Sequence, residues 1–296
     1  MIIKHLKENT LEAFKDFCRK HKTIHDESYL YEEDLDDLDL EIHPTLLLYD
    51  QDKIIGVLSV MLDPYFLKAS KSRIRIFYCE SGLLSHYTML LEAMPRLKGI
   101  KTIEAFLPVH NEASIQIFSS LGFSYYRTAY IMKRAHQDQP TYNFPDSYTL
   151  KPFVKDRDEV HFQTIRNEAF KTLKGSEQAL DMDMVKKITS ADYLIKDGIQ
   201  LLYFKDHPIG LVRVEEDQDV KGKFSFIAPI ALLPDHQGKG LGKELLNAGI
   251  SLGYDCNLET CQLCVNAENE QALSLYKRAG FVIDEAIGCY HLKYNS

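Results

Sequence analysis

The hydrophobic pattern of the second half of the chain changes repeatedly between the two-residue period of strands and the 3.6-residue period of helices. Apolar runs bounded by turn formers predict strands over residues 148–153, 200–205, 209–216, 223–233 and 261–265. Helical spacing predicts helices within residues 156–191, from 241 onward, and over 268–279. Residues 281–293 predict two closing strands. The second half is therefore predicted to be a mixed α/β domain.

The first half of the chain follows a similar pattern. Residues 1–6 predict an opening strand, and the apolar runs of residues 46–57 predict a hairpin like that of residues 201–211. The pattern Asn-x-x-small-x-x-apolar-aromatic-x-x-x-Gly-Phe occurs twice with identical spacing, once from Asn111 and again 158 residues later from Asn269. Such a match indicates an internal repeat.

The boundary between the repeats is predicted in a polar stretch with two prolines, residues 135–146, where neither periodicity persists. We therefore expect a first domain over residues 1–138, a linker over 139–147 and a second domain over 148–296. A chain of 296 residues with 45% hydrophobic and 26% charged residues is long enough for two such domains.

Composition narrows the classes of function. The 35 basic and 43 acidic side chains give a net charge of -8 without a basic patch, which disfavours a nucleic-acid partner. The segment Met1–Lys7 carries charge in its first apolar stretch and lacks the pattern of a secretory signal. No segment is apolar enough to span a membrane, and the six cysteines are too scattered for a disulfide framework. We expect a cytoplasmic protein with no membrane partner.

Closely spaced glycines follow the strand predicted to end at Leu233. Gly238, Gly240 and Gly242 separate this strand from the next helix. A glycine-rich turn lets the main chain approach a ligand, and free N–H groups at a helix start attract anions. The segment therefore predicts a phosphate or pyrophosphate site. Its spacing matches neither the dinucleotide fingerprint nor the P-loop, which disfavours NAD and ATP.

The spacing does match Gln/Arg-x-x-Gly-x-Gly/Ala, through Gln237, Gly240 and Gly242. Together with the downstream motif that runs from Asn269 to Phe281, it makes residues 148–293 resemble the GNAT superfamily of acyltransferases. The resemblance implies two tandem α/β domains, each a mixed, mostly antiparallel sheet flanked by helices. It also implies acetyl-CoA as co-substrate and no metal.

The resemblance further implies where acetyl-CoA is held. Asn269 would help to hold the pantetheine or phosphate arm. The thioester would lie in a splay between two parallel strands, residues 225–233 and 261–265, opened by a bulge that Pro229 suits. The pyrophosphate would lie on the backbone of Gln237, Gly238, Lys239, Gly240, Leu241 and Gly242.

Acetyl transfer needs a donor to the developing oxyanion and a proton for the departing thiolate. The resemblance assigns the oxyanion donor to a backbone N–H at Leu232 or Leu233. It assigns the acid to Tyr276, which would also contact the cofactor. A phenol with an ordinary pKa of about 10 can protonate a thiolate. The alternative for Tyr276 is a half-buried aromatic residue on an apolar helix face.

The base is where the chain departs from the family pattern, because the central strand carries no carboxylate over residues 224–230. Glu215 and Glu216 could act through water, although a pair of carboxylates at the end of a strand is commonly just solvated. An amine that arrives deprotonated would need no strong base. The base is therefore left open.

The first half lacks the glycine signature, and Phe118 stands where the second half has Tyr276. We expect a degenerate, non-catalytic copy. Cys261 and Cys264 form a C-x-x-C on a predicted strand without a second ligand pair, so we expect no metal or redox role for them.

The sequence thus predicts an N-acetyltransferase that moves an acetyl group from acetyl-CoA to a primary amine of a small molecule or peptide, acting as a monomer or homodimer. Acyl transfer to oxygen is one alternative. A CoA-binding sensor or assembly module without catalysis is the other; the missing strand carboxylate favours this alternative slightly, and the retained Tyr276 opposes it.

Overall fold

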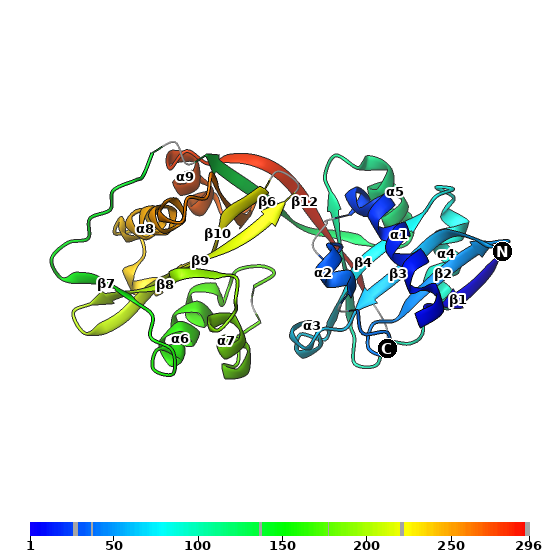
Figure 1. The fold of residues 1–296 in the computed structure, drawn as a ribbon, viewed down its shortest axis with the longest axis horizontal. Helices are drawn as coiled ribbons and strands as arrows, with labels where there is room; N and C mark the ends of the chain where they lie inside the picture. Colours follow the sequence, from blue (N-terminus) through cyan, green and yellow to red (C-terminus); the bar gives the residue numbers. More distant parts are fainter. Residues whose placement is uncertain (26–28, 37, 136–137, 177, 220–221, 294–296) are drawn as a thin grey trace. The chain divides into compact units, whose positions relative to one another are not determined.

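The computed structural model describes residues 1–25, 29–36, 38–135, 138–176, 178–219 and 222–293 (Figure 1). The chain forms two compact units. The first comprises Met1–Thr128 and the C-terminal segment from Ala286, and the second comprises Ala129–Glu285. Each unit is a mixed sheet with helices on both faces, which confirms the predicted fold class.

In the first unit, neighbouring strands are antiparallel except for one parallel pair, β4 with β5. The strands in spatial order are β1 (Ile2–His5), β2 (Thr45–Asp50), β3 (Lys53–Met61), β4 (Lys71–Cys79), β5 (Thr102–Pro108) and the end of β12 (Val282–Lys293). The helices are α1 (Leu11–His21), α2 (Glu32–Asp36), α3 (Pro64–Lys68), α4 (Leu84–Ala93) and α5 (Glu112–Ser120), with short 3-10 turns at Glu8–Thr10 and Lys22–Ile24.

Strand β2 shows how the two-residue period builds a core on each face of this sheet. Leu46 and Leu48 belong to one hydrophobic cluster, together with Leu90 of α4. Leu47 belongs to another cluster, together with Phe14 of α1. Helices α4 and α1 therefore cover opposite faces of the first sheet.

The second unit repeats this arrangement, with β10 and β11 as its parallel pair. Its strands in spatial order are β7 (Tyr148–Pro152), β8 (Leu194–Phe204), β9 (His207–Asp219), β10 (Gly222–Leu232), β11 (Thr260–Asn266) and the end of β6 (Ser124–Ala135). Its helices are α6 (Glu159–Phe170), α7 (Met182–Thr189), α8 (Leu241–Asp255) and α9 (Glu270–Arg278), with a 3-10 turn at Pro234–His236.

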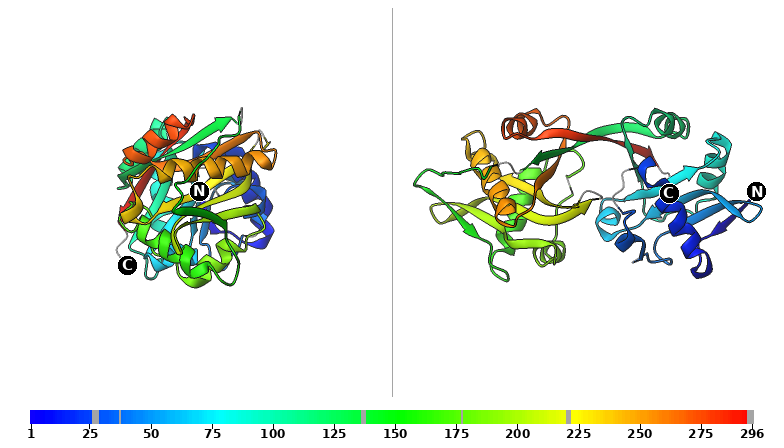
Figure 2. Two further views of the ribbon diagram at one scale, coloured as in Figure 1. Left: turned by 90° about the vertical axis from the view of Figure 1, so that its left-hand side faces the viewer. Right: turned by 45° about the horizontal axis from the view of Figure 1, so that its top comes forward.

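Helices α6 and α8 lie on opposite faces of the second sheet (Figures 1 and 2). Helix α8 packs closely because of Gly249, where an added Cβ would meet Val212 Cγ2 at 2.9 Å and Ile227 Cδ1 at 3.3 Å. The side chains of Val212 and Val214 thus face α8, and those of the intervening residues of β9 face α6. None of the helices among the described residues is long and apolar enough to cross a bilayer.

The closing strands differ from the prediction. Residues 281–293 were expected to form two strands, but β12 is one continuous strand. Gly288 lies inside this strand. Glycine suits the position because an added Cβ there would be 2.7 Å from the Tyr290 ring. The end of β12 pairs with β5 over Ile287–Lys293, and the end of β6 pairs with β11 over Ala129–Ala135.

Each sequence half therefore supplies the last strand of the sheet built mainly by the other half. Each compact unit contains residues from before and after the predicted linker at residues 139–147. The linker therefore stays a prediction about where one sequence repeat ends and the next begins.

Candidate functional site

The parallel strands β10 and β11 of the second unit are paired over only three residues each. Ser225, Phe226 and Ile227 lie opposite Cys261, Gln262 and Leu263. The pairing of β10 with β9 then shifts register between Ile227 and Ile230. The shift spans the cis peptide bond Ala228–Pro229, and proline has no N–H to donate. Among the described residues, β10 and β11 are not paired beyond Ile227 and Leu263, which is where the family resemblance implies a splay.

The end of β10 presents backbone N–H groups to this splay at alternate residues. Leu233 N donates to Ile209 O at 2.9 Å, so the N–H of Leu233 is used in the ladder with β9. Leu232 lies opposite Gly210 in the adjacent non-hydrogen-bonded pair, so its backbone groups face away from β9. Of the two expected oxyanion donors, Leu232 is therefore the one directed at the splay.

The side chain of Gln237 ties the glycine loop to this strand end. Gln237 Nε2 donates to Leu232 O at 2.9 Å. The first residue of the glycine motif thus has a structural role beyond its backbone, because it fixes the loop beside the splay. The sequence motif gave no indication of this contact.

The glycine loop has the open backbone that an anion site requires. Gly238 and Gly240 have φ values of 72° and 80°, and a Cβ at either would meet no atom within 4 Å. Lys239 Nζ donates to Asp235 O at 2.7 Å, which keeps the ammonium group at the loop. Leu241, the first residue of α8, is buried in the core and anchors the helix start.

The first N–H groups of a helix have no intrahelical acceptor, and in α8 Lys243 N of the first turn bonds to Gly240 O at 3.1 Å. Gly242 lies in this turn, where an added Cβ would be 3.7 Å from Leu275 Cδ2. The loop and the start of α8 therefore offer N–H groups, an ammonium group and the positive end of a 15-residue helix in one place.

Asn269 caps helix α9. Its Oδ1 accepts the N–H of Ala272 at 3.1 Å. In the first unit Asn111 accepts the N–H of Ser114 at 3.2 Å in the same way. Helix capping therefore accounts for the asparagine that begins both copies of the repeat, and it occupies one acceptor of the Asn269 side chain.

Tyr276 lies on α9 with its ring 6.1 Å from the ring of Phe281. Burial raises its pKa to about 12, and the nearby Cys264 thiol acts in the same direction. Cys264 follows Leu263, the last residue of β11 in the parallel pairing. The Tyr276 phenol thus remains protonated through neutral pH, on the helix that directly follows β11 in the chain.

The two candidate bases have different environments. Glu216 is 39% exposed and forms an ion pair with Lys223. Glu215 is 15% exposed, and its Oε2 lies 2.6 Å from Arg213 Nη2. The expectation of a solvated pair was wrong for Glu215, because β9 extends to Asp219 and places it inside the strand.

In the first unit the corresponding groups contact the chain itself. Phe77 N on β4 donates to His25 Nε2 at 3.1 Å. The amide group of Asn111 donates to Ile24 O at 3.2 Å. The buried ring of Phe118, which replaces Tyr276, lies 5.8 Å from the His25 ring. Residues 24–25 therefore contact three groups of the first unit: the end of β4, the capping Asn111 and the ring of Phe118. The counterparts of these groups belong to the candidate site in the second unit.

We expect His25→Ala to destabilise the protein by about 1–3 kcal/mol, because the buried N–H of Phe77 would lose its acceptor. Urea unfolding monitored by circular dichroism measures the change. His110→Ala, which removes an exposed imidazole of the same unit, is the control. Equal midpoints for the two variants would contradict a structural role for His25.

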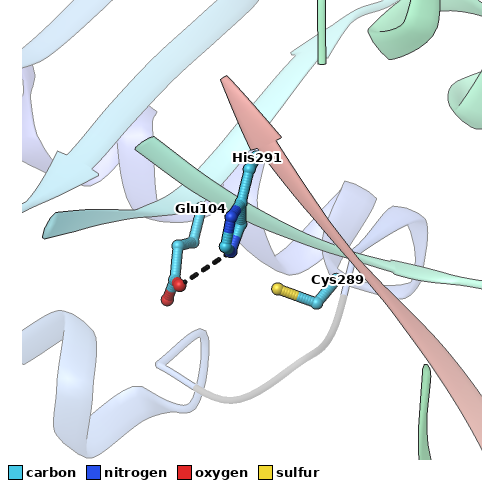
Figure 3. A group of neighbouring side chains, drawn as sticks. All are labelled: Glu104, Cys289 and His291. Atoms are coloured by element: carbon cyan, nitrogen blue, oxygen red, sulfur yellow. Dashed lines mark ion pairs between the residues drawn. The ribbon is translucent and has the colours of Figure 1, made fainter. Parts of the chain in front are cut away.

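A separate cluster of possible metal ligands lies in the first unit. Among the described residues, Glu104, Cys289 and His291 bring one ligand atom each within 4.8 Å of the others (Figure 3). His291 Nε2 lies 3.0 Å from Glu104 Oε1, which Lys71 Nζ also approaches at 2.7 Å. Burial raises the pKa of the Cys289 thiol to about 12. Lys71 thus already contacts the Glu104 carboxylate of this cluster.

Comparison with known proteins agrees with this fold. Residues 162–281 match the family model described as the acetyltransferase (GNAT) family. A GCN5-related N-acetyltransferase from Sphaerobacter thermophilus has a similar structure, with a TM-score of 0.74 at 15% identity over 100% of this chain and 96% of that one. A tandem GNAT protein from the clavulanic acid biosynthesis pathway has a TM-score of 0.67 at 11% identity over 100% and 99%. Residues 162–281, which lie in the second unit, therefore match the GNAT family.

Among curated proteins, the chain is similar to mycothiol acetyltransferases. It is 28% identical over 200 residues to that of Paenarthrobacter aurescens, which covers 65% of this chain and 61% of the relative. It is 25% identical over 189 residues to that of Streptomyces coelicolor, which covers 59% and 56%. The chain therefore matches about six tenths of the length of these relatives.

Proposed function

We propose that the second unit is an acetyl-CoA-dependent N-acetyltransferase that transfers an acetyl group to a primary amine by direct attack. The observation that supports this most strongly is the position of the glycine loop. It starts a buried helix at the end of β10, next to the splay that Tyr276 borders. An anion site and a proton donor thus flank a gap between two parallel strands.

In this proposal, the loop backbone from Gln237 to Gly242 binds the pyrophosphate, with Lys239 supplying positive charge. The pantetheine arm enters the splay between β10 and β11, where it replaces the missing strand pairing. The N–H of Leu232 stabilises the oxyanion. Leu233 then supports the site through the hydrogen bond that its N–H donates to Ile209 O of β9. Asn269 supports the site by capping the start of α9.

Tyr276 is proposed as the general acid. As the amine nitrogen bonds to the carbonyl carbon and the carbon–sulfur bond breaks, the phenol gives its proton to the departing thiolate. The raised pKa keeps this proton in place until the thiolate forms. The environment of Tyr276 is thus consistent with an acid that works at neutral pH.

A small-molecule amine is the acceptor that we favour. The curated relatives are named as mycothiol acetyltransferases, which points to a small molecule rather than a protein. The first unit is proposed to bind no acetyl-CoA, because residues 24–25 fill its strand end.

Titration calorimetry with acetyl-CoA tests the proposal, followed by thiol release with a panel of amino acids, amino sugars, polyamines and short peptides. We expect one binding site per chain and amine-dependent release of CoA. Binding without turnover of any amine would favour a sensor or assembly module. Two sites would contradict the degenerate first unit, and no binding would rule out the acetyltransferase.

A further inference from the structure

A buried ion pair in the second unit has no part in the function proposed above. Arg213 and Glu215 lie on β9 with side chains 11% and 15% exposed, and Arg213 Nη2 is 2.6 Å from Glu215 Oε2. Desolvation makes such a pair expensive to bury, so it is weak evidence for a purely stabilising role. Its position in the sheet therefore needs another explanation.

The pair lies where β10 and β11 begin to separate. Arg213 Nε donates to Ala228 O, which belongs to the bulge of β10. Glu215 is directly opposite Phe226, and Phe226 is in turn paired with Gln262 of β11. Glu215 thus lies level with the last paired residues before the splay, and Arg213 connects it to the bulge.

Strand alternation directs this pair away from α8. Val212 and Val214 pack against α8, so Arg213 and Glu215 project from the opposite face of the sheet. Helix α6 packs against β9 and β10 on that face. The carboxylate is therefore partly shielded from solvent on the face where no phosphate loop lies.

The pair also has unused hydrogen-bonding capacity. Across the described part of the chain, Arg213 Nη1 is buried without a partner, and Glu215 Oε2 makes only the ion pair with Arg213. Buried polar atoms are normally satisfied, and a catalytic role is one explanation for an exception.

We propose that Glu215, oriented by Arg213, is the general base of the acetyl transfer. This inference rests on the proposed function. The acceptor binds as an ammonium ion and gives one proton to Glu215, directly or through a water molecule. The neutral nitrogen then bonds to the carbonyl carbon, the carbon–sulfur bond breaks, and Tyr276 protonates the thiolate. The nitrogen loses its second proton to solvent as the amide forms. The proton on Glu215 also leaves to solvent, and solvent reprotonates Tyr276, so one proton is released for each acetyl group transferred.

The charged groups around Glu215 suit this role. Burial raises the pKa of Glu215. The charge of Arg213 lowers this pKa, and the charge of Asp217 raises it. Phe226 and Leu194 lie opposite it on the neighbouring strands, and both are apolar. The one acidic group among the buried residues of α6 is Glu159, which accepts the N–H of Asp156 at the helix start. A carboxylate with a raised pKa is a stronger base near neutral pH than an ordinary one.

Glu215→Gln tests the inference in the full-length protein. We expect a fall of about 100-fold in kcat for thiol release from acetyl-CoA, with an amine from the panel and with water alone as acceptor. The Kd for acetyl-CoA, measured by calorimetry, should remain within about twofold of the value for the unmodified protein, since Glu215 is proposed to act only on the acceptor. An unchanged Kd also shows that the variant is folded. The rise of kcat/KM with pH that reports Glu215 should disappear, whereas the rise due to the amine itself should remain.

Glu216→Gln is the matched control, because it removes the neighbouring carboxylate, which pairs with Lys223 instead. It should behave like the unmodified protein. Equal rates for Glu215→Gln and the unmodified enzyme would overturn the inference and leave the acetyltransferase intact. An unmodified protein that binds acetyl-CoA but releases no thiol, even slowly with water, would overturn both proposals.

Discussion

Gly240→Glu is expected to weaken acetyl-CoA binding at least about 100-fold, equivalent to about 2.8 kcal/mol. Gly240 begins α8 with a φ of 80°, and the space beside it is open. A glutamate there would place a carboxylate where the pyrophosphate should lie, against N–H groups that the ligand needs. Calorimetry with acetyl-CoA measures the loss.

Gly82→Glu provides a matched control in the first unit. Gly82 also has a positive φ, 66°, with open space around it, and it precedes the start of α4. Both substitutions impose similar backbone strain, so only the position of the new charge differs. Unchanged binding in Gly240→Glu, or an equal loss in Gly82→Glu, would show that the glycine loop is not the anion site.

The glycine loop could be predicted from the sequence because its properties are local. Positive φ at Gly238 and Gly240, a strand before them and a helix after them all depend on residues close in the chain. The strands and helices of the second unit were predictable for the same reason. Their apolar periods directly reflect the face that each element buries.

The closing strands were not predictable, because strand pairing is a non-local property. A period of two shows that β12 is a strand, but it does not show that its end pairs with β5 of the first half. Gly288, inside this strand, makes room for the Tyr290 ring.

Glu215 shows the same limit at the level of one side chain. Its burial depends on β9 continuing to Asp219 and on the Arg213 side chain reaching Ala228 O. Neither is visible in the local pattern, which places two adjacent carboxylates near the end of a predicted strand. The alternation of faces along β9, once its length is known, separates Glu215 from Glu216.

Tyr276→Phe is expected to lower kcat about 1,000-fold and to leave the Kd for acetyl-CoA nearly unchanged. The substitution removes only the hydroxyl group, so the ring can still pack near Phe281. The thiolate would then have to leave without a positioned proton donor. Thiol release at saturating acetyl-CoA and amine, together with calorimetry, separates the two effects.

Tyr203→Phe is the control, since it removes another phenol of the second unit whose pKa burial raises, on β8. Its turnover should not change.

The pH dependence gives an independent check on Tyr276. Because its pKa is raised to about 12, the acid form persists well above pH 10, so the rate should not fall as the pH passes through the ordinary range of tyrosine. A decline centred near pH 10 that is absent from Tyr276→Phe would mean that the phenol is more solvated than its surroundings indicate. Full turnover in the Tyr276→Phe variant would show that solvent protonates the thiolate and that Tyr276 serves only to pack α9.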